Sequence, residues 1–541
     1  MPPEKLPGWA RWRNLLTRRR IVLRSALLGA GSLLALGTKD AFDYSAAPTK
    51  EKGSDFVFPP GTGQEIPAAA AATQPSASLH FEQRGGFTND ASHLNKTAVF
   101  GIAAPADEDG VRDALQYARA NRLKVTCMGQ QHSMGGQSFT HGGLLLDLRA
   151  LNHITLDPKA KSMNVQSGAR WWQVQQRLDG IGLAVKSMQS INIFSLGGSL
   201  SVNGHGIDPA PGPLAPTVRS VRIMLGSGEV VRASPTENAE LFRHTLGGYG
   251  LFGVILEAEL DAVPNELYSR DTLYLDYKEF PSWYLRNVEG NQQIGLAFAR
   301  LSMAPQSYLR ETAVHLYRRT TSESPLPKLE PDRHETLERF VINLSKTGRL
   351  GRWTRWTLEK YAEPQLHPCL TRNETMHQKH DCVVSRNAEM YDDMAYLRNR
   401  LQDTDILQEY FIPYDQFPVF ADSLRTVVRK NGANLLNVTI RTVHKDTLTA
   451  LPYAKADMFG LVLYFNVGFN TRENEILKKT TTDLIDAAQD AGGTFYLPYR
   501  LYYSPAQLRR SYPEIDEFFA TKRAYDPVGL FSNQWFERYG A

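Results

Sequence analysis

The alternation of hydrophobic and polar residues predicts short strands mixed with helices from about Thr88 onward. Val111, Leu115 and Ala118 share one face of a helix that begins after the acidic stretch 107–109. The same reasoning predicts helices at 171–178 and 240–246, a hairpin at 218–233 that turns at Gly226–Gly228, and strands at 123–128, 144–148, 153–156, 162–166, 183–186 and 253–260. Because no long βαβ repeat is present, this pattern indicates an α+β fold.

The rest of the chain differs in amino-acid composition. Residues 265–470 are richer in aromatic residues and arginine, with a strand expected at 461–467 and a helix at 391–401. Residues 471–541 return to a helix at 476–489, followed by a Gly-Gly turn and an aromatic strand. We therefore expect a domain at 88–264, a second domain at 265–470 and a C-terminal segment at 471–541.

The N-terminus has the features of a targeting segment. The basic cluster Arg18–Arg20 precedes an apolar stretch, Ser25–Gly37, which is short and rich in Gly and Ala for a membrane span. It resembles a twin-arginine export signal, and small residues near Ala35 suit cleavage. An uncleaved anchor is the alternative, so we expect 1–37 to direct the protein to the periplasm or to anchor it facing that compartment. Residues 38–87 have linker composition and are expected to be disordered.

Net charge and cysteine content exclude some classes of function. The net charge is only +4 and, beyond the N-terminus, basic residues are dispersed, which argues against a nucleic-acid partner. Three cysteines exclude a disulfide scaffold. Cys369 and Cys382 form one bridge or remain free thiols. Their neighbours His367, His377 and His380 suggest a metal, but the spacing fits no tight zinc site, so we favour a polar loop over the active site and predict no metal.

Three glycine-rich segments, 129–138, 195–206 and 246–255, carry the main chemical signal. Glycine permits close approach and positive φ, so such turns can present successive backbone N–H groups to a diphosphate. Ordered glycines cost backbone entropy, and their repeated use suggests contact with a long, flat ligand. No GxGxxG motif opens a helix after the first strand, so a Rossmann dinucleotide site is not supported.

The order and spacing of GQQHSMGGQS, SLGGSLSVNGHG, VRIMLGSGEVV and ELFRHTLGGYGLFGVILEAEL resemble the FAD-binding half of the vanillyl-alcohol oxidase superfamily, which includes cytokinin dehydrogenases and alditol and aldonolactone oxidases. The resemblance implies a two-subdomain, PCMH-type FAD-binding domain at 88–264, an α+β substrate domain and a C-terminal segment that packs back on the FAD domain. The cofactor-binding residues that it implies are Gly129, Gln130, Gln131, His132, Ser133, Met134, Gly197, Gly198, Ser201, Gly204, Gly250, Gly253, Val254, Ile255 and Asn533.

His132 has a special place in this resemblance. Family members with a His-Ser pair in the first loop carry the flavin on that histidine through the 8α-methyl group, so the resemblance implies covalent FAD at His132. A neutral imidazole is a competent nucleophile once the two groups are held together. The alternative is a histidine that only hydrogen-bonds the cofactor. No cysteine lies between Lys186 and Gly206, so we expect a single bond at most.

The substrate side departs from both groups of relatives. The segment NVTIRTV resembles the strand that carries a Glu-x-Arg pair in alditol and aldonolactone oxidases, but Thr439 stands in place of the glutamate before Arg441. The aspartate of cytokinin dehydrogenases aligns with Ser190, which argues against cytokinin as substrate. Arg441 is either a substrate contact or part of a structural salt bridge.

Alcohol oxidation by a flavin needs a proton acceptor as hydride leaves carbon. The candidate catalytic residues are Glu409, Glu389, Tyr499, Arg500 and Arg441, of which an arginine is better suited to stabilise an alkoxide or carboxylate. The predicted activity is hydride transfer from a C–OH or C–NH carbon of a small molecule to FAD, then to oxygen, a quinone or a cytochrome. The alternatives are a non-catalytic flavin-binding protein and a metal-dependent hydrolase.

Overall fold

The computed structural model describes residues 79–321, 329, 343–362, 376–378, 381–390 and 403–540. The segment expected to be an export signal or anchor, most of the expected linker and the helix expected at 391–401 lie outside these ranges. Within them, no helix has the length and apolar character needed to cross a membrane. The described chain is a mixture of helices and sheets, which confirms the α+β class.

The first part of the N-terminal domain is a four-stranded sheet in the order β1 (Phe81–Arg84), β4 (Gly101–Ala103), β6 (Leu144–Asp147) and β5 (Val125–Met128). Helix α2 (Glu108–Ala120) packs on it and starts where the Asp107 side chain accepts a hydrogen bond from Gly110 N. A small ribbon of β2 (Phe87–Thr88) and β3 (Thr97–Ala98) lies beside it. Ordered structure starts before Thr88, because Phe81 packs edge-on against Tyr117 of α2.

The second part of this domain is a six-stranded antiparallel sheet. Its strands are β11 (Val230–Ala233), β10 (Val218–Met224), β12 (Val254–Pro264), β8 (Ser162–Gln166) and β7 (Ile154–Asp157), with β9 (Leu183–Val185) pairing to the end of β12. The helices are α3 (Trp171–Asp179), α4 (Leu196–Ser201), α5 (Ala239–Thr245) and the short η1 (Ala215–Thr217). The expected hairpin and both expected helices are present.

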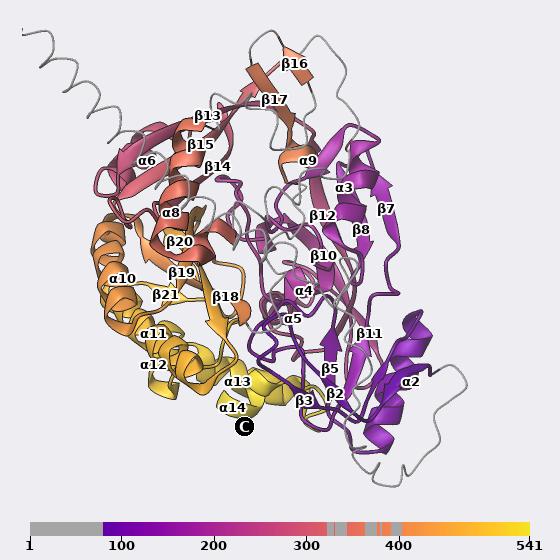
Figure 1. The fold of residues 1–541 in the computed structure, drawn as a ribbon. Helices are drawn as coiled ribbons and strands as arrows, with labels where there is room; N and C mark the ends of the chain where they lie inside the picture. The colour runs from indigo at the N-terminus through magenta and orange to yellow at the C-terminus, as the bar shows by residue number, and fades with distance from the viewer. Residues whose placement is uncertain are drawn as a thin grey trace, which may run out of the picture.

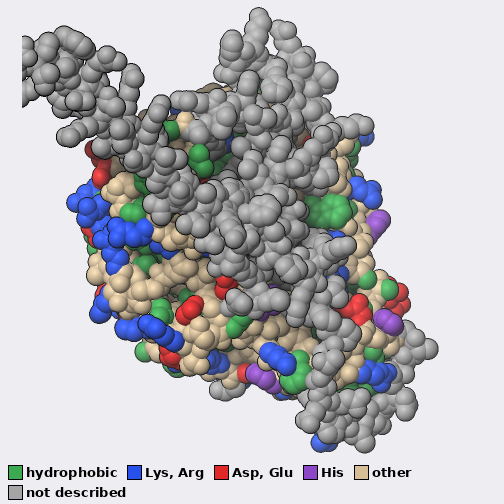
Figure 2. All heavy atoms as spheres, viewed as in Figure 1, with side chains coloured by type: hydrophobic (Ala, Val, Ile, Leu, Met, Phe, Trp, Pro, Cys, Tyr) green, Lys and Arg blue, Asp and Glu red, His purple; other side chains and the backbone are tan. Residues whose placement is uncertain are grey.

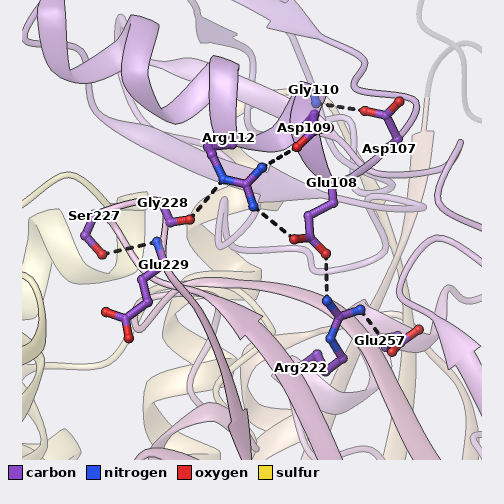
Figure 3. A network of polar contacts seen from close by, with 10 residues as sticks. All are labelled: Asp107, Glu108, Asp109, Gly110, Arg112, Arg222, Ser227, Gly228, Glu229 and Glu257. Atoms are coloured by element: carbon purple, nitrogen blue, oxygen red, sulfur yellow. Dashed lines mark hydrogen bonds and ion pairs between the residues drawn. The ribbon is translucent and has the colours of Figure 1, made fainter.

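An ion-pair network joins the two parts of the N-terminal domain (Figure 3). Glu108 on α2 lies 2.9 Å from Arg112 and 2.7 Å from Arg222 on β10, and Arg222 also reaches Glu257 on β12 at 3.1 Å. Arg112 Nε donates to the carbonyl of Gly228 in the β10–β11 turn over 3.2 Å. These contacts hold α2 against the second sheet and so fix how the two parts meet.

The second domain is built on a nine-stranded sheet in which every described pair is antiparallel. Its strands, in spatial order, are β16 (Met376–Gln378), β17 (Asp381–Ser385), β13 (Leu267–Asp276), β15 (Glu311–Thr320), β14 (Ile294–Leu301), β19 (Leu435–Val443), β20 (Met458–Gly468), β18 (Asp403–Pro413) and β21 (Thr494–Phe495). Its helices and turns are α6 (Phe280–Asn287), η2 (Ser345–Thr347), α8 (Gly348–Thr357), η3 (Leu358–Ala362), α9 (Arg386–Glu389), η4 (Tyr414–Gln416), α10 (Phe417–Asn431) and α11 (Thr471–Asp490).

One face of this sheet is covered and the other faces the N-terminal domain. Helices α10 and α11 lie along the outer side of the molecule, away from the N-terminal domain (Figure 1). Gln408 points to that side and donates to Thr481 of α11 over 2.6 Å. Side chains alternate along a strand, so Glu409 points the other way, toward the N-terminal domain.

The C-terminal segment returns to the N-terminal domain later than expected. Helix α11 and strand β21 belong to the second domain, because β21 pairs with β18 and α11 packs on the sheet. The return follows them, through α12 (Pro505–Ser511), α13 (Ile515–Tyr525) and α14 (Gln534–Tyr539). There Phe531 forms a parallel bridge with Val125 of β5.

On the face drawn in Figure 2, Lys and Arg side chains are interspersed with Asp and Glu.

Candidate active site

A cavity of about 620 Å³ lies between the two domains. The N-terminal domain contributes the loop after β5, helix α4 and the turn after α5, while the second domain contributes side chains from β14, β18, β19 and β20. The predicted cofactor residues that line it are Gly129, Gln130, Gln131, His132, Ser133, Gly197, Gly198, Ser201, Gly250, Gly253 and Ile255. The three glycine-rich segments, distant in sequence, therefore meet at one site.

The loop 129–138 holds a demanding backbone conformation. Gln131 has a φ of 54°, in the left-handed region that non-glycine residues seldom adopt. A Cβ at Gly129 would come within 2.1 Å of Ser195 Oγ, so only glycine fits. The loop is held from outside, since Met134 N donates to the carbonyl of Pro498 over 2.8 Å. The chain thus fixes this loop at the cavity wall.

The other two glycine segments close the same wall. Gly197 N donates to Ser167 O over 2.7 Å, and a Cβ on Gly197 would lie 2.7 Å from Ser167 Cβ. Gly250 has a φ of +72°, and a Cβ there would meet nothing within 4 Å, so its backbone borders open space. The first glycine serves close backbone packing, and the second leaves room for a ligand.

Two hydroxyl groups test whether this wall suits a polar cofactor. The Oγ atoms of Ser167 and Ser190 are buried at the cavity and have no hydrogen-bond partner within the described part of the chain. Buried polar groups are almost always hydrogen-bonded, so these two are suited to a ligand with oxygen acceptors. Glycine turns with exposed backbone and spare hydroxyl donors fit the ribityl and diphosphate portion of FAD.

His132 lies in this wall with its ring edge-on to Phe194, the centroids 4.6 Å apart. Both ring nitrogens are shielded from solvent. Burial lowers the pKa of His132 to about 3, although a hydrogen bond with the backbone of Gln130 acts in the opposite direction. The imidazole is therefore neutral at physiological pH, the form that can act as a nucleophile.

Four predicted cofactor residues do not line the cavity. Met134 and Val254 are fully buried in the core. Gly204 packs against Gln189, whose side chain a Cβ would meet at 2.6 Å. Asn533 caps α14 by accepting from Phe536 N, and its Nδ2 donates to the Tyr249 carbonyl over 2.9 Å. Its amide is therefore used within the protein, away from the cavity lining.

A buried pair, Glu409 and His205, lies where the second domain meets α4. Glu409 Oε1 and His205 Nε2 are 2.6 Å apart and both side chains are almost inaccessible, although the contact lacks the alignment of a directed hydrogen bond. Phe411, Tyr453 and Tyr496 surround the histidine ring. The sequence analysis identified Glu409 but not His205. The only feature of the sequence that could have indicated His205 is its position within the glycine segment 195–206.

The remaining catalytic candidates separate into two groups. Tyr499, Glu389 and Arg441 line the cavity, and Glu389 Oε1 accepts from Tyr317 Oη. Arg500 does not line it. Its Nη1 donates to the side chain of Asn95 and, over 3.4 Å, to the Met134 carbonyl. This arginine braces the first glycine loop, because its donors point toward the loop backbone.

An arginine cluster on the second domain was not predicted. Arg300 on β14 and Arg355 on α8 share Glu359, at 3.2 and 2.8 Å, and all three side chains line the cavity with Arg441. Burial alone would raise the pKa of Glu359, but the neighbouring guanidinium groups of Arg300 and Arg355 lower it. The sequence alone does not predict this cluster, because α8 lies far from β14 and β19 along the chain.

Several of the His and Cys residues considered for a metal or a disulfide bridge lie outside the described part of the chain. No group of three or more His, Cys, Asp or Glu suited to a metal occurs among the residues that the structure describes. His367, Cys369 and His380 lie outside those residues, while His377 pairs with Cys382 across the β16–β17 hairpin. Cys127 is a free thiol, and burial raises its pKa to about 12.

Comparison with known proteins bears on the same region. Residues 100–234 match the family model described as an FAD binding domain. The chain carries an FAD-binding domain. This match contains the loop of His132 and the segment 195–206, two of the glycine motifs on which the resemblance rests. The matched residues therefore contain the first two glycine segments, and the third follows them in the turn between α5 and β12.

Several oxidoreductases are similar to part of the chain. Cytokinin dehydrogenase 2 of Arabidopsis thaliana is 27% identical over 39% of this chain and 43% of its own length. A putative D-arabinono-1,4-lactone oxidase of Neurospora crassa is 32% identical over 30% of this chain and 29% of its own. An uncharacterized oxidoreductase of the fasciation locus of Rhodococcoides fascians is 30% identical over 34% and 41%. The chain thus matches less than half the length of each relative.

Proposed function

We propose that the protein is an FAD-dependent oxidoreductase that removes a hydride from a C–OH carbon, or less favourably a C–NH carbon, of a small molecule. The observation that carries the proposal is the single cavity in which the FAD-binding wall faces a buried carboxylate, Glu409, of the second domain. FAD, when bound, would supply the two-electron acceptor at this site. Oxygen, a quinone or a cytochrome would then take the electrons.

Within this proposal the glycine loops and the hydroxyls of Ser167 and Ser190 hold FAD, and His132 attaches it covalently. The neutral imidazole of His132 supports that role, because protonation would remove the lone pair needed for bond formation. Only one attachment is expected, since no cysteine lies near the second glycine segment.

Glu409 and His205 are the proposed proton acceptors. Oxidation of an alcohol releases a hydroxyl proton together with the hydride, so the reaction needs a base in the same cavity. Glu409 is a buried carboxylate that meets this need, and His205 lies 2.6 Å from it as a second acceptor. Tyr499 also borders the cavity and is proposed to orient the substrate.

The relatives suggest two donor types, an amine for a cytokinin dehydrogenase and a carbohydrate-derived lactone for the fungal oxidase. Ser190 lines the cavity where the resemblance leads one to expect the amine-binding aspartate, so a C–OH donor is favoured here. The absence of family carboxylates at Ser190 and Thr439 favours a second candidate, a flavin-binding protein without catalysis.

Two measurements test these proposals. After acid denaturation and electrophoresis, the wild-type band should fluoresce as flavin and the His132→Ala band should not. Flavin released from the wild type by acid would refute the covalent attachment. Anaerobic mixing with a panel of sugar alcohols, hydroxy acids and amines should bleach the bound flavin for one class. Yellow protein that no donor reduces would favour the non-catalytic candidate.

We also propose periplasmic export through residues 1–37.

A further inference from the structure

The arginine cluster of the second domain has more donors than its protein partners use. Arg355 is fully committed, since its guanidinium contacts Glu359 at 2.8 Å, Ser345 Oγ at 2.9 Å and the Leu436 carbonyl at 3.3 Å. Arg300 contacts Glu359 through Nη1 alone, and its Nε is buried without a partner among the described residues. Arg300 therefore retains unused donors at the cavity.

Arg441 is still less engaged. Its Nε is buried with no hydrogen-bond partner, and no described carboxylate lies within ion-pair distance of its guanidinium. The other two carboxylates at the cavity are occupied elsewhere, because Glu389 accepts from Tyr317 and Glu409 contacts His205. A guanidinium remains charged at any physiological pH, so Arg441 presents to the cavity a cation that has no ion-pair partner among the described residues.

Strand pairing brings Arg300 and Arg441 to the same patch of sheet. Arg300 of β14 lies directly opposite Thr439 of β19. Arg441 follows two residues later and thus points to the same face, and both side chains line the cavity. Thr439 lies between them, its Oγ1 accepting from Asn437 Nδ2 over 2.9 Å. Thr439 is therefore the neighbour of both arginines on this face of the sheet.

The charge balance shows what this patch lacks. Glu359 is a single carboxylate shared by Arg300 and Arg355, so among the described residues one of these two charges and that of Arg441 have no ion-pair partner. A partly buried cation without a counter-ion is costly, and the cost falls when an anion binds. The planar guanidinium fork matches a carboxylate, which can accept two parallel N–H bonds.

We propose that Arg300 and Arg441, with the hydroxyl of Thr439, form a carboxylate-binding subsite, and that the substrate is an organic acid bearing the oxidisable C–OH group. This inference rests on the proposed function and narrows its substrate class. Thr439 is what opens the subsite: a glutamate there would occupy both arginines with an internal carboxylate. The threonine leaves those donors to the ligand.

The test measures binding to the flavin-loaded protein rather than turnover. Benzoate and its neutral analogue benzamide are titrated by calorimetry, with the flavin absorption spectrum recorded in parallel. Benzoate should bind and benzamide should bind at least about tenfold more weakly, because hydrogen bonds to a charged group contribute strongly. Inorganic phosphate serves as a second anion. Tighter binding of phosphate than of benzoate would overturn the carboxylate assignment.

Matched variants locate the effect. Thr439→Glu should weaken benzoate binding by about ten- to hundredfold, while Thr439→Gln, of similar size but uncharged, should weaken it far less. Arg441→Gln should act like Thr439→Glu, and Arg349→Gln, at an exposed position of α8, should leave the affinity unchanged. Equal effects of the two Thr439 variants would overturn the inference.

The failures of the two proposals are distinguishable. Protein that never binds flavin contradicts the proposed function. Flavin that is reduced by a neutral alcohol, in protein that binds benzoate no better than benzamide, contradicts the carboxylate subsite alone.

Discussion

Attachment of FAD to His132 should be insensitive to mild acid. The reacting form is the neutral imidazole, and burial lowers the pKa of His132 to about 3. For a histidine with an ordinary pKa of about 6.5, only about 3% of the rings are neutral at pH 5. With the lowered pKa nearly all remain neutral, so the two cases differ by about thirtyfold in the expected rate at that pH.

The assay uses flavin-free protein from riboflavin-limited cells. FAD is added at a series of pH values between 5 and 8, and acid-stable flavin fluorescence in the protein band is followed over time. Quenching of free FAD fluorescence reports non-covalent binding at each pH, and His132→Ala provides the background. A flat rate after correction for binding is expected. A rate that falls with a midpoint near pH 6.5 would refute the reasoning, because it would show an exposed, ordinary imidazole.

Three further outcomes are expected. Lys346→Met should destabilise the protein by about 3–5 kcal/mol in denaturant unfolding, since it strands Asp405 of a fully buried pair; Lys479→Met, in an exposed pair, should cost less than about 1 kcal/mol. Glu409→Gln should slow anaerobic flavin reduction by about 10²- to 10⁴-fold with flavin content unchanged, and an unchanged rate would exclude it as the base. Gly129→Ala should lower the flavin-to-protein ratio, because a Cβ there would lie 2.1 Å from a neighbouring hydroxyl.

Local signals in the sequence were enough to find the residues of one cavity wall. The glycine segments keep their chemistry within about ten residues of chain, and they came together as expected around His132. The same holds for α2, because its apolar face and its Asp107 cap both depend on residues that are close together in the sequence. By contrast, β1 was missed because its strand is short and follows an Ala- and Pro-rich stretch.

The second domain was less predictable because its contacts are non-local. The Glu409–His205 pair joins residues far apart in sequence, and the Arg300–Thr439 register depends on which strands pair. Residue type alone also does not show where a side chain is used. Asn533 was a candidate for cofactor binding, yet its amide donates to the Tyr249 carbonyl, and no local pattern in the sequence indicates this contact.

The late return of the chain sets the order in which the cofactor site can be assembled. The first glycine loop is held by the carbonyl of Pro498, and β5 is bridged by Phe531, so the cradle depends on residues that leave the ribosome long after the loop itself. Until the chain has been synthesised through Phe531, β5 and the loop lack these partners. We therefore expect flavin to be loaded after translation, and a nascent chain stalled before Pro498 should emerge without cofactor.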